Sequence, residues 1–128
     1  MATPRAEEQA QAQLEGIQEL VVTLIAAEGS GDDDKLESAL EAIREDPLSV
    51  AIRSDWTVPG YTLEPAEYLI LLCTGGPAVR IIGELSQYNE AETATLEYQD
   101  WFTPWVELVL TEEEEIALLR YAQQFYYS

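Results

Sequence analysis

The chain has 128 residues, of which 25 are acidic and 6 basic, so its net charge at pH 7 is −19. The acidity is spread along the sequence, with a net charge of −10 in residues 1–64 and −9 in residues 65–128. A charge of this size repels nucleic acid and anionic membrane surfaces and disfavours both, so we expect neither as a direct partner.

Residues 1–12 contain no apolar side chain larger than alanine after Met1, and we expect a flexible N-terminus there, followed by a single domain over residues 13–128. From Leu14 to Ile25, large apolar residues recur at helical spacing. Glycines around Ser30 end this helix, and residues 32–46 continue as a second one, opened by three aspartates. The pair predicts a helical hairpin.

Beyond Pro47 the apolar period changes from 3.6 to 2, which is typical of strands. The predicted strands are residues 50–56, 68–73, 78–85 and 93–100, with a short edge segment over residues 106–110. Residues 68–73 are apolar at every position and predict a central strand covered on both faces. Thr111 and Glu114 have the spacing of a capping box that starts a last helix. The sequence therefore predicts an α+β protein: an N-terminal helical hairpin, a four-stranded antiparallel meander and a C-terminal helix packed on the sheet.

Catalysis and metal binding are disfavoured by what the chain lacks. It has no histidine, the commonest general base and metal ligand, and its single cysteine, Cys73, lies in an apolar run. Residues 74–77 are rich in glycine but lack the lysine of a phosphate-binding loop, and they predict a hairpin turn. The three aspartates of residues 32–34 do not have the spacing of a calcium loop and predict a helix cap. We expect no catalytic residue, no metal and no cofactor.

Aromatic residues form the first candidate binding site. The set comprises Trp56, Trp101, Phe102 and Trp105, which includes all three tryptophans of the chain. One interpretation is that these side chains close the core beneath the C-terminal helix. The other is that they are exposed and supply apolar contacts to a partner protein.

Carboxylates form the second candidate site. The residues expected to contact a basic partner are Asp32, Asp33, Asp34, Glu37, Glu41, Glu45, Glu112, Glu113, Glu114 and Glu115. Glu37, Glu41 and Glu45 recur every four residues and line one face of the second helix. Such a surface can imitate the potential of a phosphate backbone, although the same charge could serve solubility alone.

Four stretches of the chain carry a resemblance: residues 45–56, 70–79, 97–105 and 121–126. Over roughly residues 40–127 the chain resembles small acidic accessory proteins of proteobacterial integrating conjugative elements and plasmids. The resemblance implies an inhibitor of a host defence complex, of the anti-CRISPR or antirestriction kind, that acts as a DNA mimic. The alternative is an antitoxin-like or assembly partner that neutralises one cognate protein through the aromatic residues. Because the sequence has no apolar run long enough to span a membrane and no signal-peptide pattern, we expect a cytoplasmic protein.

Overall fold

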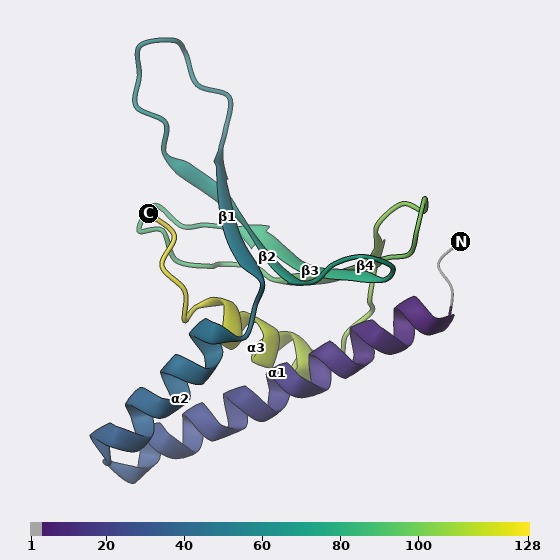
Figure 1. Ribbon diagram of the computed structural model, residues 1–128. Coiled ribbons are helices and arrows are strands. Elements are labelled where there is room, and N and C mark those ends of the chain that lie inside the picture. The colour runs from purple at the N-terminus through teal and green to yellow at the C-terminus, as the bar shows by residue number, and fades with distance from the viewer. Residues whose placement is uncertain (1–3) are drawn as a thin grey trace.

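The protein combines three helices with one antiparallel sheet, within the residues 4–128 that the computed structural model describes (Figure 1). The elements are α1 (Pro4–Ser30), α2 (Asp33–Glu45), β1 (Ser49–Ser54), β2 (Pro65–Cys73), β3 (Ala78–Glu84), β4 (Thr95–Gln99), β5 (Val106–Glu107) and α3 (Glu112–Ala122). The predicted α+β class is confirmed. The sheet has five strands rather than four, because the short segment β5 pairs with β4.

Helix α1 is longer than its apolar pattern indicates. It begins at Pro4, so residues 4–12, which we expected to be flexible, form its first turns; the prediction for residues 1–3 lies outside the described residues. Ala6 and Ala10 are fully buried and continue the stripe of Leu14 and Ile17. Alanine has the highest helix propensity and lets a helix approach its neighbours closely, so small residues extend the packed face beyond the large ones.

Side-chain caps define where α2 and α3 begin. The side chain of Asp32 accepts hydrogen bonds from the backbone N–H groups of Asp34 and Lys35, at 3.0 and 3.3 Å. Thr111 and Glu114 form the predicted capping box at the start of α3. Helix α2 folds back along α1, which confirms the helical hairpin (Figure 1).

The sheet is a meander in the order β1-β2-β3-β4-β5, and all three described helices lie on the same side of it (Figure 1). Tyr68, Ile70 and Leu72 of β2 face these helices and are buried. Leu69 and Leu71 face the other side and are only half-buried. The expectation that this strand is covered on both faces is therefore wrong, because the described chain supplies helices for one face only.

Three buried tyrosines of the core donate hydrogen bonds from their hydroxyl groups to acceptors on other parts of the chain. The Tyr68 hydroxyl donates to the Thr93 carbonyl at 2.5 Å, and the Tyr127 hydroxyl donates to the Ala122 carbonyl at 2.6 Å. The Tyr121 hydroxyl donates to a carboxylate oxygen of Asp46 at 2.7 Å and so joins α3 to the end of α2. Burial raises the pKa of all three phenols far above the ordinary value, because an apolar surrounding disfavours the phenolate.

Close packing at Gly83 predicts a large effect from a single methyl group. A Cβ atom at this position would lie 2.0 Å from the Thr93 carbonyl oxygen and 2.7 Å from the Tyr68 ring. We expect Gly83→Ala to lower the free energy of unfolding by at least about 2 kcal/mol, measured by urea denaturation. The matched control is Gly16→Ala in α1, where a Cβ atom meets nothing within 4 Å. That variant should gain about 1 kcal/mol from helix propensity, and equal losses in both variants would contradict the packing argument.

The buried tyrosines predict a loss of stability at alkaline pH. Their pKa values are raised in the folded state, whereas an unfolded tyrosine ionises near pH 10. Their stabilising contribution is therefore complete below about pH 10 and decreases as the pH rises above that value. We expect the urea midpoint to fall between about pH 9 and about pH 11, and to fall less in Tyr127→Phe, which removes one of the groups. An equal fall in the variant and the parent would show that other groups cause it.

Candidate interaction surfaces

Acidic residues gather on the helical side of the molecule. The three described helices contain fourteen acidic and four basic residues, a net charge of −10, whereas the five described strands contain four acidic and two basic residues. Thirteen of these fourteen helical carboxylates are exposed, and the exception, Glu114, is half-buried. Because α1, α2 and α3 lie on one side of the sheet, they form a single acidic layer (Figure 1).

Helix α2 presents the most regular part of this acidic layer. Glu37, Glu41 and Glu45 are all exposed and lie one turn apart, with a rise of about 6 Å along the helix axis between neighbours. Asp33 and Asp34 extend the negative charge to the N-terminal end of the helix, and both are exposed. The structure thus brings together the predicted α2 carboxylates on one helix.

Two of the predicted partner-binding carboxylates serve the fold. Asp32 caps α2, as described above, and an oxygen of Glu114 accepts a hydrogen bond from the Thr111 backbone N–H at 2.8 Å. Both positions also favour negative charge, because the helix dipole places partial positive charge at the N-terminus. Glu112, Glu113 and Glu115 remain exposed at the start of α3 and belong to the acidic layer.

The four predicted aromatic residues do not form one site. Trp56 follows the end of β1, whereas Trp101 and Phe102 follow the end of β4, and in this antiparallel meander those are opposite ends of the sheet. Trp105 is half-buried, and its ring lies 3.9 Å below the guanidinium carbon of Arg80. Trp56 and Phe102 are fully exposed, so they do not close the core beneath α3.

Trp101 and Phe102 form an exposed aromatic corner between β4 and β5, with ring centroids 6.0 Å apart. The Trp101 ring packs against Gly76, where a Cβ atom would lie 1.7 Å from the indole nitrogen. Phe102 has a φ of 61°, a left-handed conformation that bulky residues rarely adopt. Hydrogen bonds between Asp100 and Thr103 close the turn around it. The turn therefore holds a strained residue whose aromatic ring is entirely exposed.

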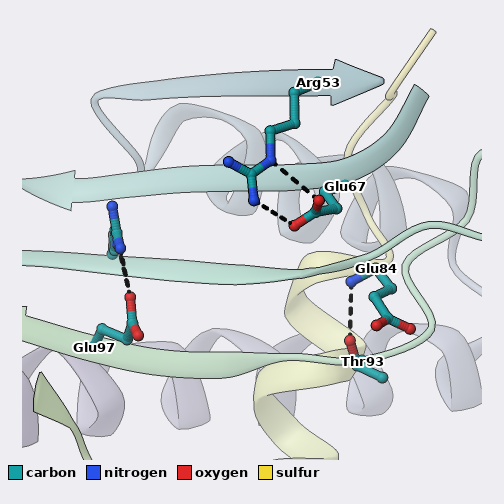
Figure 2. A network of polar contacts seen from close by, with 6 residues as sticks. Arg53, Glu67, Glu84, Thr93 and Glu97 are labelled. Carbon is teal, nitrogen blue, oxygen red and sulfur yellow. Dashed lines mark hydrogen bonds and ion pairs between the residues drawn. The ribbon is translucent and has the colours of Figure 1, made fainter. Parts of the chain in front are cut away.

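The open face of the sheet carries two arginine–glutamate pairs on neighbouring strands (Figure 2). Arg53 of β1 donates two hydrogen bonds to Glu67 of β2, at 3.1 and 2.8 Å, and these lower the pKa of the Glu67 carboxyl group. Arg80 of β3 donates to Glu97 of β4 at 2.8 Å and stacks on Trp105. Both arginines therefore balance local acidic residues.

The free edge at β1 is a feature that the sequence analysis missed. All residues of β1 except Ser54 are exposed, and residues 55–64 form a long connection to β2 that extends away from the sheet (Figure 1). We call this connection the β1–β2 arm. Its exposed apolar side chains are Trp56, Val58, Tyr61 and Leu63, each at least 67% exposed. The sequence signal that could have indicated this arm is a proline–glycine pair within residues 55–64, surrounded by four large apolar residues and only two charged ones.

The tip of the arm is a defined turn. The Tyr61 backbone N–H donates to the Val58 carbonyl at 3.2 Å, and Gly60 has a φ of 96°. With Pro59 before it, Gly60 has the conformation required at the third position of a type II turn. The turn fixes Val58 and Tyr61 at the two ends of the tip.

Residues 4–128 contain neither a metal-binding cluster nor a membrane-spanning helix. No group of three or more carboxylate or cysteine side chains in this range is arranged to hold a metal ion. None of the helices in the same range is both long enough and apolar enough to cross a membrane. Comparison of the chain with protein-family models, with curated proteins and with solved structures found no match.

Unequal burial of the two arginine pairs predicts unequal effects on stability. The Arg80 and Glu97 side chains are 23% and 17% exposed, against 75% and 40% for Arg53 and Glu67. We expect Arg80→Ala to cost about 1–2 kcal/mol in urea denaturation, because it removes a shielded ion pair and a cation–π contact. Arg53→Ala should change stability little, since solvent screens its pair. Equal losses would mean that the stacking on Trp105 contributes nothing.

Proposed function

We propose that this protein is a non-catalytic inhibitor that occupies a basic, nucleic-acid-binding surface of a host defence complex. In this proposal the acidic layer of α1, α2 and α3 imitates the charge of duplex DNA. The observation that carries the proposal is the net charge of −10 on helices that lie together on one side of the sheet. The choice of a restriction or CRISPR complex as the target follows from the resemblance to accessory proteins of mobile elements.

The spacing of charge supports mimicry. A phosphate strand of B-DNA carries one charge per about 3.4 Å of axis, and Lys- and Arg-lined channels are built to neutralise such charges. The α2 carboxylates repeat at about 6 Å along the helix axis, and those of α1 and α3 add to the same layer. A basic channel would gain from releasing counterions on both surfaces, and the interaction should weaken as salt rises.

Charge placement favours mimicry over solubility alone. Solubility requires a net charge away from zero but no gathering of that charge on one side. Here residues 47–83, which form β1, the β1–β2 arm, β2 and most of β3, have a net charge of only −1. The remaining parts of the chain, residues 1–46 and 84–128, each have a net charge of −9.

A second candidate function rests on the aromatic corner. Exposed aromatic rings are common hot spots of protein interfaces, and residues held in strained conformations gather at functional sites. Phe102 is 101% exposed at a φ of 61° and Trp101 is 64% exposed. Through these two residues the protein would neutralise one cognate protein, and apolar contacts of this kind would persist at high salt.

Capture of host proteins tests both candidates. The tagged protein is incubated with lysate from a host that carries restriction and CRISPR systems, at about 100 mM and about 500 mM salt. Mimicry predicts a restriction or Cas subunit that is captured at low salt only and displaced by duplex DNA. The triple variant Glu37→Gln, Glu41→Gln, Glu45→Gln should weaken that capture by at least about tenfold, since it removes three charges from the interface.

A matched control variant tests whether capture depends on the position of the carboxylates or only on the net charge of the protein. The variant Glu64→Gln, Glu90→Gln, Glu92→Gln removes three exposed loop carboxylates and should leave capture nearly unchanged. Equal loss in the two triple variants would contradict a specific acidic layer. A partner retained at about 500 mM salt and lost in Phe102→Ser would replace mimicry by the aromatic-corner function. Capture of no partner under either condition would leave solubility as the role of the charge.

A further inference from the structure

The two edges of the sheet differ in how they are protected from pairing with another strand. The β5 edge is two residues long and carries Glu107, and short charged edges resist pairing. The β1 edge is six residues long, contains no acidic residue, and ends the strand order without a neighbour among the described strands. An exposed edge of this length is a template for another strand.

The core is incomplete along β1. Val50 and Ile52 pair with Ile70 and Tyr68, and directly paired residues face the same side of a sheet. Ile70 and Tyr68 are buried beneath the helices, yet Val50 and Ile52 are 38% and 43% exposed. Leu48, at the start of the strand, is 60% exposed. The apolar layer between sheet and helices therefore continues to the edge and stops uncovered there.

This edge also belongs to the part of the chain that carries the least net charge. Residues 47–83 have a net charge of −1, against −9 for each of the flanking parts of the chain. Within β1 itself the only charge is Arg53, which Glu67 balances. A basic partner would gain little from β1 itself, whereas β1 of a second copy would bring no acidic side chain to the contact.

The β1–β2 arm complements this edge in an antiparallel arrangement. Antiparallel pairing places the end of one strand beside the start of the other. Trp56 is the second residue of the arm, just beyond the end of β1, and Leu48 lies just before the start of β1, so each Trp56 would lie near Leu48 of the second copy. Both side chains are exposed in the single chain, and the contact would occur twice, as a two-fold interface requires.

We infer that β1 pairs antiparallel with β1 of a second copy, forming a two-fold dimer with one continuous sheet. The axis must run perpendicular to the sheet, because only that rotation reverses the strand and keeps it in the same plane. Val50 and Ile52 would then face Val50 or Ile52 of the second copy, and both helical layers would lie on the same side. This dimer does not depend on the proposed function, but it would double the length of the acidic layer.

Sedimentation velocity of the full chain tests the dimer. We expect the dimer fraction at a fixed protein concentration to increase from about 50 mM to about 500 mM salt, because salt screens repulsion between the charged parts and leaves apolar contacts intact. This dependence is opposite to the one expected for capture of a basic target. A protein that sediments as a monomer at both salt concentrations, up to about 100 μM, would overturn the proposal.

Two isoleucine variants locate the interface. Ile52→Lys would place two like charges close to the two-fold axis, within the apolar contact, and should weaken dimerisation by at least about tenfold. The matched control, Ile25→Lys, changes an isoleucine of α1 that is 54% exposed, and it should dimerise like the parent. Unchanged dimerisation in Ile52→Lys, or equal loss in both variants, would contradict the β1 edge as the interface.

Further measurements distinguish loss of the dimer from a folding defect and from failure of the proposed function. At a protein concentration low enough for both variants to be monomeric, circular dichroism should show the same thermal midpoint for Ile52→Lys and Ile25→Lys, so that loss of the dimer is not loss of the fold. A second variant, Trp56→Ser in the exposed arm, should weaken the dimer without altering the sheet. The α2 triple variant should dimerise at least as well as the parent while losing its basic target, so either proposal can fail alone.

Discussion

Burial of one face of the sheet by helix α1 is the constraint on which the rest of the structure depends. Its apolar stripe packs on β3 and β4, and α2 and α3 pack against its flanks. Apolar burial of this kind supplies most of the favourable free energy of folding. Because the described helices all lie on that side, the opposite face and the β1 edge are left without a covering layer (Figure 1).

The same arrangement explains how a chain with a net charge of −19 folds compactly. Most of its carboxylates lie on the outer surfaces of the helices and in the loops, where water screens their mutual repulsion. Carboxylates at the N-termini of α2 and α3 also interact favourably with the helix dipoles. The acidic layer is thus compatible with the fold, and its exposed charge remains available to a basic partner.

The two proposed surfaces would bind their partners through different forces. The acidic layer attracts through Coulomb forces, which weaken with salt, whereas the β1 edge and its arm attract through backbone pairing and apolar burial. They lie on different parts of the chain, so occupation of one leaves the other accessible. In a dimer, the two acidic layers would lie side by side on the same face, and a longer basic channel would be the better match.

Local patterns in the sequence determined the helices, the strand order and the caps, because periodicity and capping depend on neighbouring residues. The position of Thr111 and Glu114 predicted the start of α3, and the apolar alternation predicted the meander. Only the tertiary structure decided which apolar residues are covered. Leu69, Ile52 and Trp56 are of residue types common in protein cores, yet Leu69 lies on the open face of the sheet, Ile52 on its free edge and Trp56 in the exposed arm. It also separated Trp56 from Trp101 and gathered the helical carboxylates in one layer, because both depend on which sides of the sheet distant segments occupy.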